Sequence, residues 1–153
     1  MRCVVFPDSL RTIGLEAFVD CDRLYRFEGK PIEQIKIESG AFDNCMDLAD
    51  ENGFIIINDI LFCSPAKYMY EELSVPDGVT ETSFRAFWSE ADEYDMRLPG
   101  AVRNGCRIVN LPPSVKTIRL DSFGENTKIV NIASSTNVIG CVEDNTKIKI
   151  NRY

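Results

Sequence analysis

The segment VVFPDSLRTIGLEAFVDCDRL, residues 4–24, decides the fold because its order of residue types returns further along the chain. The segments LSVPDGVTETSFRAF at 73–87 and VNLPPSVKTIRLDSF at 109–123 align with residues 4–18 without a gap. Each starts with two apolar residues around a third residue, then has a proline and turn formers. A phenylalanine (Phe18, Phe87 or Phe123) follows eleven residues after that proline. Such self-similarity is the signature of a repeat architecture.

The second half of the unit recurs once more, at residues 37–48. There isoleucine, alanine, phenylalanine, cysteine and leucine keep the spacing that they have at residues 13–24. This copy has one extra residue between Leu24 and Phe42, and it lacks the apolar-proline strand end that the other three share.

The residues of one unit predict two short strands and a helical turn. Apolar residues alternate with others ahead of the proline, which predicts a strand that ends there because proline has no N–H to donate. A second extended piece reaches Ile13, and residues 16–21 predict a helical turn with Phe18 and Cys21 on one side. One unit cannot bury its own apolar face, whereas stacked units can. The repeat therefore predicts a solenoid of roughly five or six irregular coils.

Composition excludes several function classes. The net charge of −7 leaves no basic surface of the kind that neutralises the phosphates of nucleic acid, and it would not draw the chain to an anionic membrane. The longest apolar stretch, residues 54–62, is too short and interrupted to span a bilayer, and no secretory signal is visible at the N-terminus. The absence of histidine removes Ser-His and Cys-His nucleophile pairs and histidine-ligated zinc.

The unit resembles the BspA-like leucine-rich repeat, whose pattern is roughly L-x-x-I-x-I-P-x-x-V-x-x-I-G-x-x-A-F-x-x-C-x-x-L. Residues 4–24 match this pattern almost completely. The matching positions are Val4, Phe6, Pro7, Leu10, Ile13, Gly14, Ala17, Phe18, Cys21 and Leu24. Elsewhere the match decays: residues 50–72 resemble a longer, non-standard unit with a turn at Asn58 and Asp59, and residues 89–106 match poorly.

The resemblance implies an α/β fold class, as a right-handed leucine-rich-repeat solenoid that is rich in strands with short helical turns. We expect one domain over residues 1–153, which is a fragment of a longer surface protein or a short member of the family. The resemblance supplies no catalytic residues, cofactor or metal. It implies surface or secreted proteins that adhere to host or partner proteins, so the expected location is extracellular or the cell surface. The cytoplasm is the alternative, since this chain shows no signal peptide.

The polar and reactive residues allow other interpretations. Cys21 and Cys45 occupy the buried cysteine position of the family, and we expect free thiols there, with a disulfide between adjacent coils as the alternative. The acidic residues after Phe18 and Phe42 are expected to be solvated rather than to bind calcium, because they follow neither the EF-hand spacing nor another dense acidic repeat. The acidic run at residues 90–95 is expected to be a solvated loop, with docking of a basic partner as the alternative. No carboxylate pair stands out for hydrolysis.

The strand-lined face is the candidate binding surface. In each strand the residue between two inward apolar side chains must point outward. These residues are Val5, Ser74 and Asn110, with Glu28 and Asn131 as weaker equivalents in less regular copies. Tyr25 and Arg26 lie beside Glu28 and are residue types that often anchor interfaces. Trp88, Tyr94 and Tyr153 fall outside the repeat core positions.

The sequence thus favours a non-catalytic protein-binding module, an adhesin-like surface protein, with an intracellular leucine-rich-repeat scaffold or regulatory protein as the alternative. The acidic charge favours a basic or neutral protein partner. The repeat phenylalanines are expected to form a single buried ladder through the coils.

Overall fold

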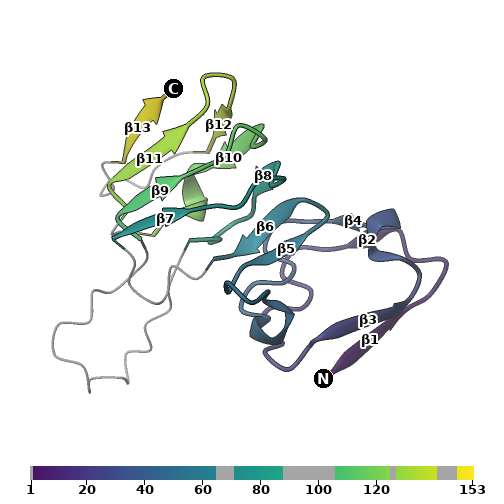
Figure 1. Ribbon diagram of the computed structural model, residues 1–153. Helices are drawn as coiled ribbons and strands as arrows, with labels where there is room; N and C mark the ends of the chain where they lie inside the picture. Colours follow the sequence, from purple (N-terminus) through teal and green to yellow (C-terminus); the bar gives the residue numbers. More distant parts are fainter. Residues whose placement is uncertain (1, 65–70, 88–105, 125–126, 141–147) are drawn as a thin grey trace, which may run out of the picture.

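The computed structural model describes residues 2–64, 71–87, 106–124, 127–140 and 148–153. Short strands stacked on successive coils dominate it, and together they form a strand-rich solenoid (Figure 1). The strands are β1 (Cys3–Phe6), β2 (Thr12–Ile13), β3 (Arg26–Gly29), β4 (Lys36–Ile37), β5 (Ile55–Ile57), β6 (Ile60–Cys63), β7 (Glu72–Ser74), β8 (Glu81–Thr82), β9 (Ile108–Asn110), β10 (Thr117–Arg119), β11 (Ile129–Ile132), β12 (Asn137–Ile139) and β13 (Lys149–Arg152).

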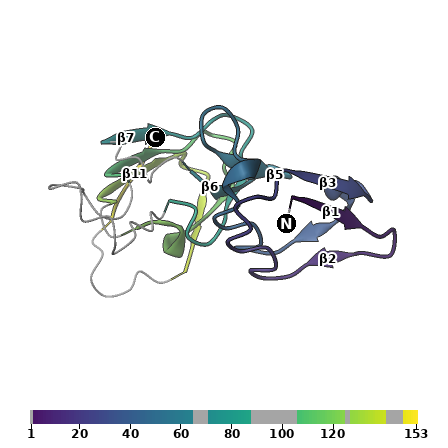
Figure 2. The same cartoon turned by 90° about the horizontal axis from the view of Figure 1, so that it is seen from below.

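The first strands of the coils form one row, which is split into two sheets. Strands β7, β9, β11 and β13 make a four-stranded parallel sheet, while β1 and β3 make a separate parallel pair. Their inward residues Leu73, Val109 and Val130 are buried, as the period-two alternation requires. Figure 2 shows β7 and β11 at one end of the molecule and β1 and β3 at the other.

The second strands of the coils form another row, which a hairpin interrupts. Its sheets are β2–β4 and β12-β10-β8-β6-β5, and all pairs are parallel except β5–β6. The turn between β5 and β6 is Asn58-Asp59, whose φ angles are 52° and 61°. Two adjacent residues with positive φ are typical of the tight hairpin turn that matches strand twist. The turn predicted at these residues is confirmed, and the non-standard unit at 50–72 contains this hairpin.

The structure contains much less helix than the predicted α/β class implies. Within the described residues, the helices are the short 3-10 turns η1 (Ile32–Gln34), η2 (Met46–Leu48) and η4 (Leu120–Ser122). The predicted helical turn at residues 16–21 is instead a run of tight turns. Its backbone enters the left-handed region at Glu16 (φ 54°) and Asp20 (φ 56°), which breaks helical geometry. Strand-rich solenoid therefore describes the chain better than α/β.

Two apolar clusters fill the interior, and the hairpin lies between them. Leu61 of β6 belongs to the cluster that contains Phe87 and Phe123, whereas its neighbour Phe62 belongs to the cluster that contains Phe42. Because alternate residues of a strand point to opposite faces, one strand supplies side chains to both clusters.

The predicted single ladder of phenylalanines is wrong in one respect, because the structure forms two stacked pairs. Phe18 and Phe42 stack with ring centroids 5.3 Å apart, and Phe87 and Phe123 stack at 4.9 Å. Phe42 meets Phe62 of the hairpin edge-on at 5.6 Å, so the first pair ends against the inserted unit. Phe42, Phe87 and Phe123 are buried, while Phe18 is half-buried.

Candidate protein-binding surface

A row of polar side chains runs across the sheet β7–β9–β11–β13. The register aligns Ser74, Asn110, Asn131 and Asn151 on the four strands. Asn151 Nδ2 donates to Asn131 Oδ1 over 2.9 Å, and Asn131 Nδ2 donates to Asn110 Oδ1 over 2.6 Å. Asn110 Nδ2 then donates to Ser74 Oγ at 3.4 Å. We call these four residues the asparagine ladder.

The alternation of the strands explains why the ladder faces outward. The residue that precedes each ladder residue points into the core, where Leu73, Val109 and Val130 are buried and Ile150 packs against them. One residue earlier the side chains face outward again. That outer row consists of Glu72, Ile108, Ile129 and Lys149, which are aligned in the same register.

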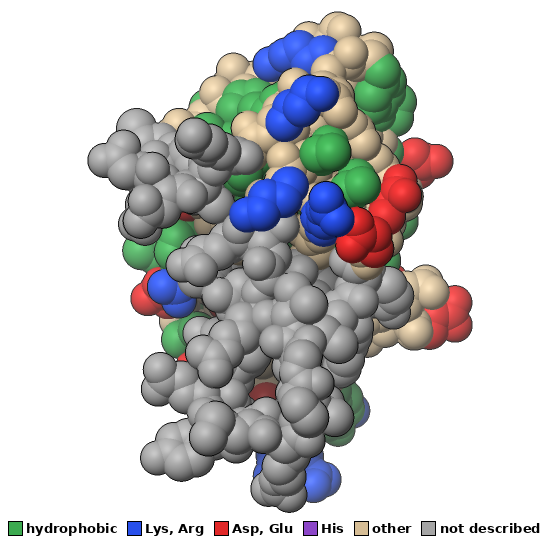
Figure 3. All heavy atoms as spheres, turned by 90° about the vertical axis from the view of Figure 1, so that its left-hand side faces the viewer, with side chains coloured by type: hydrophobic (Ala, Val, Ile, Leu, Met, Phe, Trp, Pro, Cys, Tyr) green, Lys and Arg blue, Asp and Glu red, His purple; other side chains and the backbone are tan. Residues whose placement is uncertain are grey.

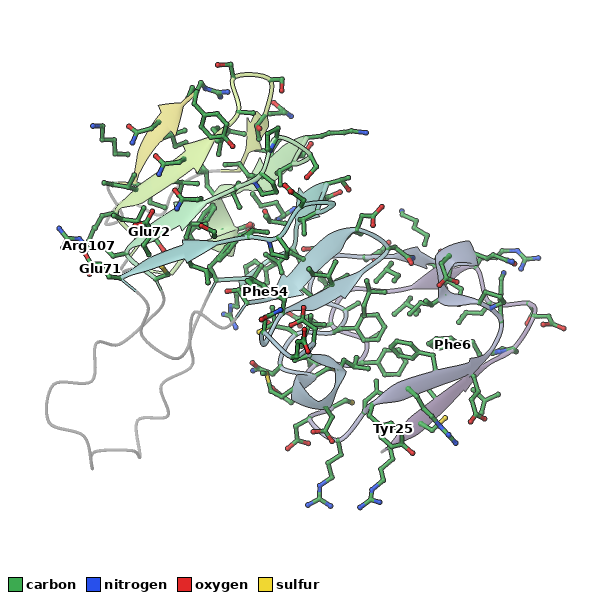
Figure 4. All side chains as sticks on the ribbon, viewed as in Figure 1. Phe6, Tyr25, Phe54, Glu71, Glu72 and Arg107 are labelled. Carbon is green, nitrogen blue, oxygen red and sulfur yellow. The ribbon has the colours of Figure 1, made fainter. Side chains whose placement is uncertain are left out.

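Charged side chains gather where these strands begin. Arg107 Nη1 forms an ion pair with Glu71 Oε1 over 3.0 Å, and Asn110 Nδ2 donates to Glu72 Oε1 over 2.7 Å. Figure 4 shows Glu71, Glu72 and Arg107 together at this edge, and Figure 3 shows cationic side chains beside acidic ones on the same side. Backbone hydrogen bonds place the exposed residues Arg107, Lys128 and Lys149 on three successive coils.

The remaining predicted binding residues lie together on β1 and β3. Val5 is 66% exposed and pairs in register with Glu28. Arg26 forms an ion pair with Glu28 over 2.7 Å, and its guanidinium lies 5.6 Å from the ring centroid of the exposed Tyr25. An exposed aromatic ring with a cation across it combines apolar area and charge at one point.

The seven predicted residues therefore form two groups rather than one continuous surface. Ser74, Asn110 and Asn131 are side by side, as predicted, whereas Val5 and Glu28 belong to the separate β1–β3 pair. Between β3 and β7 the described residues form η1, β4, η2 and the hairpin, and none of these elements belongs to this row.

Sequence reasoning missed Asn151, the fourth member of the ladder. A signal for it was present. Val109-Asn110 and Val130-Asn131 recur as Ile150-Asn151, with an apolar residue that points inward and an asparagine that points outward. The tail lacks the alanine-phenylalanine pair of the regular unit, and that absence concealed the recurrence.

Comparison with protein families identifies the repeat. The BspA type leucine rich repeat region matches residues 1–104 in six copies. The chain belongs to the BspA-type leucine-rich repeat family. No curated protein and no solved structure gave a match. In this BspA-type chain the repeat geometry continues beyond the matched residues, because β9 and β10 pair in register with β7 and β8.

The cysteines of this BspA-type chain are free thiols in the described residues, Cys3, Cys21, Cys45, Cys63 and Cys106, as expected for the repeat positions. Cys45 is buried, while Cys21 is only half-buried. Burial raises the pKa of Cys45 to about 12, and its thiol donates to the Phe18 carbonyl over 2.9 Å. Burial also raises the pKa of Cys106. A protonated, buried thiol is a poor nucleophile, so the environment of Cys45 suits packing.

Within the described residues, the acidic turns contain no group of three or more cysteine, aspartate or glutamate side chains that could hold a metal ion. Asp20 instead accepts a hydrogen bond from Asn44 Nδ2 over 3.0 Å, which joins equivalent turns of two coils. No helix in the described part of the chain is long and apolar enough to cross a membrane. The acidic run at 90–95, with Trp88 and Tyr94, lies outside the described residues.

Proposed function

We propose that this chain is a non-catalytic protein-binding module whose main docking surface is the β7–β13 sheet face. Leucine-rich repeats of this family generally serve binding rather than catalysis, and their typical ligands are proteins. The observation that supports this surface is the asparagine ladder. Hydrogen bonds between neighbouring coils hold its side chains in a single line across the sheet.

The ladder leaves hydrogen-bonding capacity for a partner. Each side-chain amide has two N–H donors and two acceptor lone pairs. Asn131 and Asn151 use one donor each in the ladder. Asn110 Nδ2 instead donates to both Ser74 and Glu72, so the further capacity of Asn110 is at Oδ1. The ladder already fixes the rotamers of its side chains. Binding there would therefore cost less side-chain entropy than binding to mobile residues. The half-buried Ile108 and Ile129 beside the ladder add apolar contact area.

The partner proposed for this surface is a basic or neutral protein. The net charge of −7 favours the approach of such a partner, and this acts on the association rate more than on affinity. The group on β1 and β3, with Tyr25, Arg26, Glu28 and Val5, provides a second contact region for a partner large enough to reach both sheets.

Substitutions on the two surfaces test the proposal. Ser74→Arg and Asn110→Arg place a bulky cation on the ladder, and Tyr25→Ala removes the exposed ring on the other group. Asn137→Arg is the matched control, because Asn137 is exposed on β12 in the other row. Proteins retained by immobilised wild type but lost from Asn110→Arg, and kept by Asn137→Arg, would support the ladder face. Unchanged retention by all three folded test variants would exclude both surfaces.

We further propose an adhesin-like role at the cell surface, with residues 1–153 forming one right-handed solenoid domain. Proteins of this family are often surface-associated. The alternative is an intracellular scaffold or regulatory module with the same fold. Antibody labelling of intact cells against permeabilised cells separates the two, since an intracellular module is labelled only after permeabilisation.

A further inference from the structure

A groove of about 460 Å³ with both apolar and polar lining lies between β3 and the β5–β6 hairpin. Its apolar lining comes from Phe27 of β3, Ile32 of η1, Leu48 of η2, and Ile56 and Ile57 of β5. This volume falls within the range of about 300–1,000 Å³ that is usual for binding pockets. The groove is separate from the asparagine ladder, which lies on other strands.

Two open strand edges border this groove. Among the described strands, β3 pairs only with β1, and β5 stands at the end of its sheet with β6 as its one neighbour. Phe27 and Ile57, from these two strands, line the same cavity. An open edge presents unpaired backbone N–H and C=O groups, which can pair with an added strand.

The local sequence explains why the row has no strand here. In the coil that follows β3, residues 55–63 fold into the hairpin with its Asn58-Asp59 turn instead of adding a strand to this row. Among the described strands, the next strand of this row after β3 is therefore β7. In Figure 1, β5 lies between β3 and β7.

The charges at the groove favour one kind of occupant. The charged residues that line it, Glu33 and Asp59, are both acidic and exposed. Nearby cations are already engaged: Arg26 pairs with Glu28 over 2.7 Å, and Lys30 Nζ donates to the Leu10 carbonyl over 2.5 Å. The groove thus offers negative charge beside the apolar side chains of its lining.

We propose that this groove binds an extended segment of a partner polypeptide, in which basic residues alternate with apolar ones, as a strand added parallel to β3. Strand addition gives affinity through backbone hydrogen bonds, while pockets for alternate side chains give specificity. The apolar side chains contact Phe27, Ile56 and Ile57, and the basic ones reach Glu33 and Asp59. The direction follows that of β1 and β3, whose pairing is parallel.

A synthetic peptide tests this site without a natural partner. The peptide is fluorescently labelled Lys-Val-Lys-Leu-Lys-Val-Lys, and binding to the full chain is measured by fluorescence anisotropy. We expect saturable binding that weakens at least about tenfold when the backbone N–H groups on one edge of the peptide are methylated. Those N–H groups form the backbone hydrogen bonds to β3 in the proposed complex. The absence of saturable binding up to about 1 mM peptide, a very weak affinity, would overturn the proposal. Equal binding of the methylated peptide would do the same.

Substitutions on the protein locate the bound peptide. The double variant Glu33→Lys, Asp59→Asn is expected to weaken binding about fivefold or more, because it removes the negative charge of the groove. The control Glu71→Lys, Glu72→Gln makes the same charge change at exposed positions where β7 begins, in a different sheet from the groove-lining strands, and should weaken binding far less. Asn110→Arg on the ladder should leave peptide binding unchanged, which separates this site from the docking face proposed above. A control variant that weakens binding as much as the groove variant would indicate only general charge attraction and would overturn the assignment.

Discussion

Asn131 lies between two asparagines and bonds to both: it donates to Asn110 Oδ1 over 2.6 Å and accepts from Asn151 Nδ2 over 2.9 Å. Asn131→Ala removes both bonds, and each net bond is worth about 0.5–1.5 kcal/mol. We expect the free energy of unfolding in urea to fall by about 1–2 kcal/mol, since the site is half-buried. Asn137→Ala, at an exposed position on β12, is the control, with an expected change within about 0.5 kcal/mol. Equal changes in the two variants would show that the ladder does not stabilise the fold.

The two phenylalanine pairs predict different costs of truncation. Phe87 is fully buried, so Phe87→Ala should lower the free energy of unfolding by about 3–5 kcal/mol through lost burial and the cavity left behind. Phe18 is half-buried, so Phe18→Ala should cost clearly less, although it loses its stacking on Phe42. Urea denaturation of both variants measures the difference. A larger cost at Phe18 would contradict the burial of the two rings.

The repeat positions were predictable from the sequence because period-two alternation and proline act locally. Leu73, Val109 and Asn110 point where their spacing requires. The break between Phe42 and Phe87 was not predictable, because it depends on how β6 distributes Leu61 and Phe62 between two clusters. That distribution is a tertiary property of an inserted hairpin, and no periodic spacing encodes it.

The candidate surface was predictable to a similar extent. Strand alternation indicated that Ser74, Asn110 and Asn131 share a face, and their register confirms it. The hydrogen bonds between them depend on side-chain rotamers, which the sequence does not specify. The groove beside β3 depends on the absence of a strand, and only the sheet topology reveals such an absence.

The buried thiol of Cys45 predicts a pH dependence of stability. Its pKa is raised to about 12 when folded, against about 8.5 for a free cysteine. A raised folded pKa contributes stability that is fully present below the unfolded pKa and is lost as pH rises toward the folded pKa. Wild type should therefore lose stability relative to Cys45→Ala between about pH 8.5 and 12. Urea denaturation of both proteins across this window measures the effect, and a constant difference would contradict it.

The same burial predicts the reactivity of Cys45 in the native chain. Its labelling by a thiol reagent at neutral pH should be slow when folded and fast in urea, because the reactive form is the thiolate. The half-buried Cys21 should react sooner, and mass spectrometry of peptides distinguishes the two. Prompt labelling of Cys45 without denaturant would contradict its burial.

The hairpin turn predicts a glycine substitution that the fold tolerates. Asp59 has a φ of 61°, which costs an ordinary side chain energy but costs glycine none. Asp59→Gly should be neutral or stabilising by up to about 1 kcal/mol, whereas Asp59→Val should destabilise by about 1–3 kcal/mol. Thermal unfolding should give a clearly lower Tm for Asp59→Val than for Asp59→Gly. Similar shifts in both would indicate that strain at this position is small.

Two glycines with similar backbone angles predict very different costs of an added methyl group. Gly29 has a φ of 82° and Gly78 a φ of 95°, so alanine is strained at both. At Gly29 the new Cβ would clash with the carbonyl oxygen of Phe6, a backbone atom held in the β1–β3 pair. At Gly78 nothing lies within 4 Å of the new atom. Gly78→Ala should therefore cost only the conformational strain, about 1 kcal/mol.

Gly29→Ala must displace β1 or β3 and should cost well over 2 kcal/mol, a large share of a typical stability of about 5–15 kcal/mol. Urea denaturation measures both variants. Because β3 borders the proposed peptide groove, Gly29→Ala should also weaken binding of the alternating peptide, while Gly78→Ala should not. If Gly29→Ala unfolds at the same urea concentration as Gly78→Ala, the close approach of β3 to Phe6 is wrong.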